Sequence, residues 1–165
     1  MEALVMSLMI WISQATGWAV PDIPKYVFLS VPEMTKTAYE CEKPSIENEH
    51  ICSMDDQDII GSDALLKPLA LYDTRNETIM LPLTFDIDSP KDQSILLHEL
   101  VHYIQWHNKL YPAKYDCRQH TEKEAYDLQE KFLLESGLDI HEEIKIGKLL
   151  RFMLTNCDAG MSWGR

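Results

Sequence analysis

Apolar and polar positions fall into blocks along the chain whose spacing predicts helices and short strands. Residues 2–15 form an amphipathic helical stretch, and Gly17, Pro21 and Pro24 end it. Residues 25–30, KYVFLS, are a short β-prone run. Residues 31–62 are polar and irregular, which predicts a long loop. The N-terminal third is therefore expected to hold one helix, one strand and an irregular excursion.

The following segments predict a β-hairpin and then helices. LALYDTRNETIMLP, residues 69–82, has the pattern of two strands around a turn at residues 73–76. A helix begins after Ser89, which can cap it, with Pro90 at the first helical position, and runs to about residue 108. A linker over residues 109–119 precedes helices over about residues 120–136 and 139–155. Since no repeat or second boundary interrupts this order, we expect one α+β domain over residues 1–165.

Composition and net charge indicate which classes of binding partner are not expected. The 165 residues are 45% hydrophobic and 25% charged, as in an ordinary globular protein. A net charge of −12 repels nucleic-acid phosphates and anionic lipid, so neither is an expected partner. The apolar N-terminal run lacks the basic start of a signal peptide, because no Lys or Arg precedes Lys25, and it is too short to span a bilayer. We expect a monomer without a membrane span.

The stretch HELVHYIQW, residues 98–106, carries the candidate chemistry. His98 and His102 are four residues apart, so on a helix both rings lie on one face and can bind one metal ion. Zinc binds imidazole nitrogens at about 2.0–2.1 Å in tetrahedral geometry. Glu99 would flank the metal, where it can take a proton from a water molecule and donate it to a leaving group. The HExxH pattern therefore predicts a zinc site with Glu99 as the catalytic base.

The plain alternative is a buried helix that carries two histidines by chance. Average composition gives HExxH in on the order of one chain in two hundred of this length. The motif, however, lies among apolar residues that cover most of the helix circumference: Leu96, Leu97, Leu100, Val101 and Ile104. Such a helix is buried, and buried imidazoles and carboxylates are costly unless they are paired or coordinated. The pattern therefore favours the metal site.

A catalytic zinc usually takes three protein ligands, and the next helix offers the third. On a helical wheel, Glu122 shares its face with Ala125 and other weakly polar or apolar residues within about 80°, whereas Glu124 falls on the solvent side. We therefore expect Glu122 as the third ligand, with Glu124 and His120 as alternatives. A helix-start glutamate that serves only the dipole is a further alternative for Glu122. His107 continues the helix of the HExxH motif and is expected to point away.

The combination resembles a known group of enzymes. HExxH on one helix, followed by a glutamate in an ExxA setting (EKEA, residues 122–125), resembles the gluzincin zinc metallopeptidases. The short hairpin–helix–helix order is similar to their minimal members, the minigluzincins, and to small uncharacterised bacterial HExxH domains. The resemblance covers about residues 66–136. It implies a zincin-like fold and one zinc ion on His98, His102 and Glu122. It also implies that Glu99 is the general base in hydrolysis of a peptide or protein substrate.

The resemblance also implies roles outside the ligand set. In such peptidases, the strand before the active helix is a sheet edge that pairs with an extended substrate, and here that strand would be Thr78, Ile79, Met80 and Leu81. Larger gluzincins carry an acidic residue four positions after the ligand glutamate, but this chain has Tyr126 there. The partner that orients a zinc histidine is therefore open, with a backbone carbonyl or Gln129 as candidates. Four tyrosines could stabilise an oxyanion, and none is assigned: Tyr103, Tyr111, Tyr115 and Tyr126.

The four cysteines form no CxxC pair, which argues against a cysteine-type zinc site. A Cys117–Cys157 disulfide would join the Glu122 helix to the C-terminal end and close a loop of about 40 residues, which would stabilise the chain by about 3–4 kcal/mol. Cys41 with Cys52 would pin the long loop, and four free thiols are the alternative. If disulfides form, an exported or periplasmic location is favoured over the cytoplasm.

Two function classes compete with a peptidase. A non-catalytic zincin-fold module would keep zinc as a structural staple, and an acidic binding protein would hold no metal. Zinc content separates the second class from the others, and substitution of Glu99 separates a catalyst from a staple.

Overall fold

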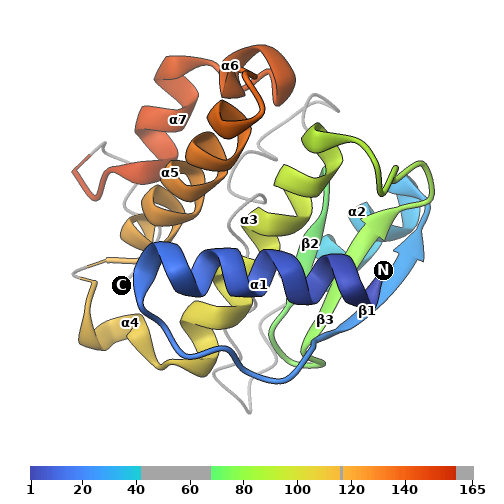
Figure 1. Cartoon of the computed structure of the whole chain (residues 1–165), viewed down its shortest axis with the longest axis horizontal. Helices are drawn as coiled ribbons and strands as arrows, with labels where there is room; N and C mark the ends of the chain where they lie inside the picture. The colour runs from blue at the N-terminus through green and yellow to red at the C-terminus, as the bar shows by residue number, and fades with distance from the viewer. Residues whose placement is uncertain (42–67, 116, 159–165) are drawn as a thin grey trace.

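The computed structural model describes residues 1–41, 68–115 and 117–158, which form a mixed α+β fold (Figure 1). Its elements, in chain order, are α1 (Glu2–Thr16), β1 (Lys25–Leu29), α2 (Val31–Cys41), β2 (Leu71–Asp73), β3 (Thr78–Pro82), α3 (Pro90–His107), α4 (Leu110–Ala113), α5 (Gln119–Glu135), α6 (Ile140–Glu143) and α7 (Lys148–Thr155). The predicted α+β class is confirmed. So are the first helix, the first strand, the hairpin, the HExxH helix (α3) and the predicted helix over about residues 120–136 (α5).

Within the described residues, the sheet has three strands in the order β1-β3-β2. β3 pairs with β2 in the antiparallel sense, with Tyr72 opposite Ile79, which confirms the predicted hairpin. β3 also pairs with β1 in the parallel sense, with Lys25 opposite Thr78. The expectation that Thr78, Ile79, Met80 and Leu81 form a sheet edge is therefore wrong. The distant KYVFL segment occupies the side of β3 that the hairpin leaves open, so β1 and β2 are the outer strands among the residues that the structure describes.

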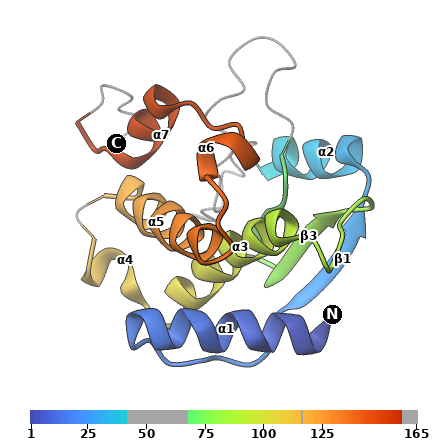
Figure 2. The same cartoon turned by 45° about the horizontal axis from the view of Figure 1, so that its top comes forward.

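Helix α3 runs through the centre of the molecule, with α1, the sheet and α5 around it (Figures 1 and 2). Its cap follows the sequence prediction, because the Ser89 side chain accepts a hydrogen bond from the Asp92 amide and Pro90 begins the helix. Apolar side chains from all of these elements form one core around α3: Val5, Leu8, Met9, Ile12, Ile79, Leu81, Leu96, Leu97, Leu100, Val101, Ile104 and Ala125. A central, nearly all-buried helix therefore holds the HExxH motif, as its apolar circumference predicts.

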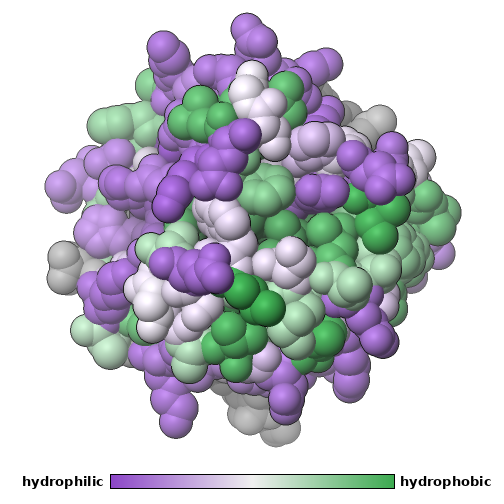
Figure 3. Space-filling model, in the orientation of Figure 1, coloured by the Kyte–Doolittle hydropathy of each residue, from purple (hydrophilic) through white to green (hydrophobic). Residues whose placement is uncertain are grey.

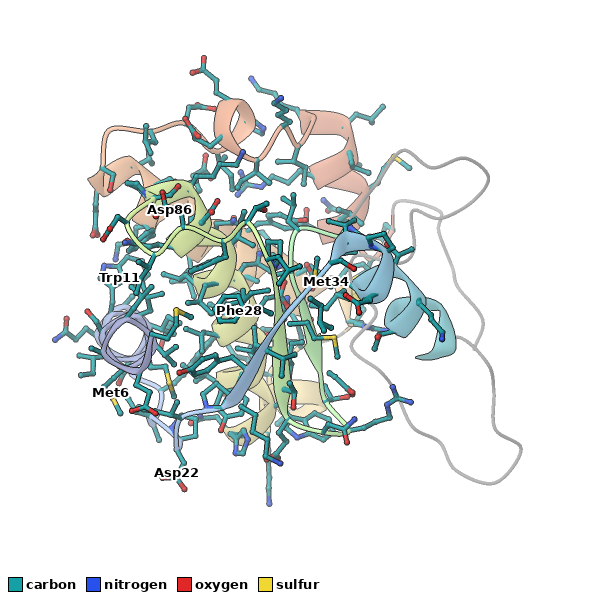
Figure 4. All side chains as sticks on the ribbon, turned by 90° about the vertical axis from the view of Figure 1, so that its right-hand side faces the viewer. Met6, Trp11, Asp22, Phe28, Met34 and Asp86 are labelled. Atoms are coloured by element: carbon teal, nitrogen blue, oxygen red, sulfur yellow. A yellow bond between two sulfur atoms is a disulfide. The ribbon has the colours of Figure 1, made fainter. Side chains whose placement is uncertain are left out.

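The predicted loop over residues 31–62 is wrong at its beginning, because residues 31–41 form α2. Ser30 and Glu33 form a capping box: the Ser30 amide donates to Glu33 Oε2 at 2.8 Å, and the Glu33 amide donates to Ser30 Oγ at 3.4 Å. Met34 is fully buried against Leu71 and Met80 on the side of α2 that faces the sheet (Figure 4). Residues 42–62 of the predicted loop lie outside the described residues.

The C-terminal region also differs from the prediction of one helix over residues 139–155. Asp139 caps the short α6 by accepting from the amides of His141 and Glu142. The chain then breaks at Lys145, whose φ of +60° is incompatible with a continuing helix, and α7 begins after Gly147. The predicted linker over residues 109–119 likewise contains the short helix α4. The break lets α7 fold back onto α5.

The molecular surface is divided by polarity. In the view of Figure 3, hydrophilic side chains cover the region over α5, α6 and α7, and hydrophobic ones gather over α1 and the sheet. The larger exposed apolar side chains there include Met6, Ile10, Val27 and Phe28. Within the described ranges, no helix combines the length and the apolar character that a membrane crossing requires.

Candidate metal site

Helices α3 and α5 lie side by side (Figure 2). Their side chains His98, His102 and Glu122 come together in the interior. His102 Nε2 lies 2.8 Å from Glu122 Oε1, and His98 Nε2 lies 3.3 Å from Glu122 Oε2. The two Nε2 atoms are 3.1 Å apart. All three side chains are buried, with Glu122 only 3% exposed. The structure therefore assembles the residue set that the sequence predicts.

The alternatives to Glu122 lie elsewhere. Glu124 accepts a hydrogen bond from Lys114 at 2.8 Å and another from the Tyr115 hydroxyl. His120 lies beside Cys157, with 3.4 Å between its Nε2 and the sulfur. His107, expected to point away, has its Nε2 3.4 Å from Glu77 Oε1. Neither Glu124 nor His120 joins the HExxH histidines.

The amide of Gln129 fixes the orientation of His98. Gln129 Oε1 lies 3.1 Å from His98 Nδ1, and Gln129 Nε2 donates to Ser94 Oγ at 3.3 Å. Ser94 Oγ in turn donates its only proton to the Lys91 carbonyl at 2.7 Å, so it must accept from the glutamine. The oxygen of the amide therefore faces the imidazole, and Nδ1 carries the proton that it donates. The sequence named Gln129 as one candidate for this role, and the structure places it there.

Gln105 does the same for His102. Its Oε1 lies 3.0 Å from His102 Nδ1, and its Nε2 donates to the Thr121 carbonyl at 3.1 Å. A carbonyl only accepts, so the nitrogen end of this amide must face Thr121 and the oxygen end must face the imidazole. Sequence reasoning missed Gln105. Its spacing, three residues after His102 on the same helix face, was the available signal.

With both Nδ1 atoms protonated, each neutral imidazole presents a lone pair at Nε2. These lone pairs and the two Glu122 oxygens converge on one buried point. Among the described residues, the polar atoms printed nearest these carboxylate oxygens are the two Nε2 atoms, with 2.8 Å from Oε1 to His102 and 3.3 Å from Oε2 to His98. A tetrahedral zinc site would separate two imidazole nitrogens by about 3.3 Å, close to the 3.1 Å found between them. The donor atoms therefore fit a zinc ion with small adjustments.

Without an ion, a proton on the imidazoles can balance the negative charge of the Glu122 carboxylate. Burial alone would raise the pKa of Glu122, but His102 and His98 outweigh it and hold that pKa well below its usual range. Burial alone would lower the pKa of His98, but Glu122 outweighs it and raises that pKa, and Glu99 acts in the same direction. Both shifts have the same effect: in the metal-free protein they favour a protonated imidazole beside an ionised Glu122 carboxylate.

Comparison with known proteins places the chain in a family. Residues 1–158 match the family described as "Domain of unknown function (DUF6647)". The chain belongs to the DUF6647 family. No curated protein and no solved structure shows significant similarity to it. The DUF6647 match includes α3 and α5, but the family description assigns no activity, so the function has to be argued from the site.

Glu99 and the nearby tyrosines complete the surroundings of the site. Glu99 is buried, at 5% exposed, beside His98 on α3. The Tyr126 ring packs edge-on against the His98 ring, with 4.6 Å between centroids, and the Arg151 guanidinium lies 5.9 Å from the Tyr126 centroid. Tyr126 therefore packs on a ring that Gln129 orients.

Two other tyrosines brace the fold. The Tyr103 hydroxyl donates to the Asp22 carbonyl at 2.8 Å, and the Tyr115 hydroxyl donates to Glu124 and lies 3.4 Å from Gln105 Nε2. The Tyr111 side chain lies outside the described residues. No tyrosine is therefore assigned as an oxyanion donor.

The expected pairing of Cys117 with Cys157 is present, with 6.1 Å between their Cα atoms at disulfide distance. It connects the residue two positions before α5 to the residue two positions after α7. The expected Cys41–Cys52 pair falls on Cys52, which lies outside the described residues.

Proposed function

We propose that the chain is a zinc-dependent peptidase with a gluzincin-type site on a zincin-like fold. His98, His102 and Glu122 would hold one zinc ion, and Glu99 would be the general base. The observation that carries the proposal is the convergence of two Nε2 lone pairs and a carboxylate, with both Nδ1 atoms committed to glutamine oxygens. Two imidazoles and one glutamate are the ligand set of a common class of catalytic zinc site.

The number of ligands favours catalysis over a structural staple. Structural zinc sites usually have four protein ligands, whereas catalytic sites keep one position for water or substrate. Within the described residues, the cluster around His98 contains three ligand side chains. A zinc ion bound there would supply Lewis acidity and would make a water molecule acidic at neutral pH.

The side chains of the chain then have separate tasks. Glu99 lies one residue from His98, where its carboxylate can accept the proton of the attacking water and pass it to the leaving amine. Gln105 and Gln129 prevent rotation of the imidazole rings, because each ring holds an amide oxygen through Nδ1. If a peptide is captured by strand addition, it must pair with β1 or β2, since both sides of β3 are occupied.

Three glutamate variants test the proposal. Wild-type protein should bind one zinc per chain and hydrolyse a fluorogenic peptide library. Glu99→Gln should retain zinc but lose at least about 100-fold in hydrolysis, because the proton acceptor is gone. Glu122→Ala should weaken zinc binding by more than about tenfold, as loss of a direct ligand must exceed the cost of an outer-shell change. Zinc content by mass spectrometry and affinity by chelator competition measure these effects.

Glu124→Ala is the matched control, since Glu124 lies on the same helix but pairs with Lys114. It should bind zinc as the wild type does. Full hydrolysis by Glu99→Gln would disprove the role of Glu99. Zinc binding without any hydrolysis would instead identify a structural staple. Wild-type protein that takes up no divalent metal at micromolar zinc would overturn the whole proposal.

A further inference from the structure

A second group of metal-ligating side chains lies outside the histidine–glutamate site. Cys117, His120 and Cys157 offer ligand atoms that all lie within 4.8 Å of one another. The His120 amide donates to the Cys117 carbonyl at 3.2 Å, which closes one turn at the beginning of α5. Residues three apart in such a turn share one side, so Cys117 and His120 face the same direction. Cys157 approaches them from the end of α7.

We propose that Cys117, His120 and Cys157 form a second zinc site when the disulfide is reduced. His120 Nε2 already lies 3.4 Å from Cys157 Sγ. With zinc–sulfur bonds of about 2.3 Å and zinc–nitrogen bonds of about 2.0–2.1 Å, a tetrahedral ion separates these two atom types by about 3.6 Å. The same geometry separates two sulfurs by about 3.8 Å, which small side-chain rotations can provide. The fourth position is available to water.

The cluster stays assembled after the disulfide breaks because other contacts hold α7 on α5. Arg151 Nη2 lies 3.0 Å from Asp127 Oδ1 and 2.9 Å from Glu130 Oε2. Leu154 is buried in the same apolar cluster as Leu133 and Tyr126. Cys157 lies only three residues after the buried Leu154, just beyond the end of α7, so it remains near α5 in the reduced protein. Its exposure gives a reductant access to the disulfide.

The chemical balance is simple. A phosphine breaks the Cys117–Cys157 sulfur–sulfur bond with one water molecule, is oxidised to the phosphine oxide, and leaves a proton on each sulfur. Binding of one divalent ion then releases two protons, one from each thiol, and leaves two thiolates and the neutral His120 imidazole as ligands.

Cobalt(II) distinguishes this site from the histidine–glutamate site, because only thiolate ligands give sulfur-to-cobalt charge-transfer absorption. The experiment uses full-length protein with Cys41→Ser and Cys52→Ser, so that Cys117 and Cys157 are the only cysteines left. The disulfide form should show no charge-transfer band. After phosphine reduction, titration should produce the band with an end point of one cobalt per chain in excess of the oxidised protein, and zinc should displace it.

His120→Ala should weaken cobalt binding by more than about tenfold. Loss of a residue that only supports a ligand already costs about 10- to 100-fold in metal affinity, and His120 would be a direct ligand. His107→Ala is the matched control and should leave the band unchanged, because His107 lies beside Glu77 instead. A reduced protein that gives no band overturns the proposal without affecting the peptidase proposal. An equally tight band in His120→Ala also overturns it, because the two thiols would then bind the ion without the imidazole.

Discussion

At the scale of single residues, two glutamines decide what the histidines can do. Gln129 anchors to Ser94 and Gln105 anchors to the Thr121 carbonyl, so each presents only an acceptor to its imidazole. The nitrogen that faces Glu122 is therefore unprotonated in the neutral ring. A hydrogen bond on the far side of a ligand thus prepares its metal-binding side.

Substitution of Gln129 tests whether its amide fixes the tautomer of His98. Gln129→Leu should weaken zinc binding by about 10- to 100-fold, because His98 loses the acceptor that fixes its tautomer. Gln129→Glu retains an acceptor and should restore most of the affinity. Gln93→Leu is the control, since Gln93 lies on α3 but donates to the Ile87 carbonyl. Equal affinities of all three variants in chelator competition would show that the amide does not position His98.

The pH dependence of the metal-free protein follows from the same residues. The raised pKa of His98 stabilises the folded state fully below about pH 6.5, and this contribution is lost as pH rises through the folded pKa. The depressed pKa of Glu122 contributes above about pH 4.5 and is lost as pH falls through its folded pKa. The pair therefore contributes most to the free energy of unfolding between about pH 4.5 and 6.5.

Urea titrations at several pH values measure this contribution. In the presence of chelator, the stability difference between wild type and Glu122→Gln should be largest near pH 5–6 and should shrink as pH rises through the raised pKa of His98. With zinc, the trend above pH 6 should reverse, because protons compete with the ion for the imidazoles. A difference that is constant across this range would contradict the ion pair.

At the scale of elements, the approach of α5 to α3 depends on one small residue. Ala125 is fully buried in the core that surrounds α3 and lies one turn after Glu122. Ala125→Leu should destabilise the fold by about 1–3 kcal/mol through overpacking and should weaken zinc binding, because α5 is displaced. Ala15→Leu on the exposed side of α1 should change neither quantity. Denaturant unfolding and zinc titration of both variants provide the comparison.

The sequence predicts this pair of helices well because both are strongly patterned. The apolar circumference of α3 predicts its burial, and the wheel position of Glu122 predicts its inward direction; each is a local property. By contrast, the pairing of β1 with β3 joins segments about fifty residues apart, and no local pattern of β3 encodes which strand lies on its second side. The edge-strand expectation was wrong for that reason.

Other features of the fold depend on motifs of only a few residues, which are harder to recognise in a sequence. The Ser30–Glu33 capping box predicts the start of α2, although the polar character of the segment favours a loop. The break after α6 depends on Lys145 in a left-handed conformation, which its residue type does not favour. Gln105 was missed because a glutamine on a helix is common. Its spacing from His102 is a weak signal, and the Thr121 carbonyl on α5, which fixes the amide, is not a local feature of the sequence.

At the scale of the whole molecule, an ion at this site would add a further link between α3 and α5, which the core and the Gln105 and Gln129 hydrogen bonds already join. If zinc binds the folded state and not the unfolded chain, zinc at about 100 times its dissociation constant should add about 2.7 kcal/mol to the free energy of unfolding. For a chain of this size, that corresponds to a rise of about 5–10 °C in Tm. Thermal unfolding with chelator and with zinc measures the shift.

Glu122→Ala is the control for this shift, because it removes a direct ligand. Its Tm should respond to zinc much less than that of the wild type. If zinc does not change the Tm of the wild type, or raises the Tm of Glu122→Ala by the same amount, the ion does not link α3 to α5.

The Gln105 amide has one more consequence. It touches the His102 ring with one end and the α5 backbone, next to Glu122, with the other. Together with Gln129, which contacts α3 from α5, this amide therefore sets the spacing of the two helices in the absence of an ion. Metal exchange should then proceed without refolding, and ions should be selected by radius and by preference for nitrogen donors. Calcium prefers many oxygen ligands at longer distances and should bind this site weakly. Cobalt and zinc should compete for binding to the same ligands.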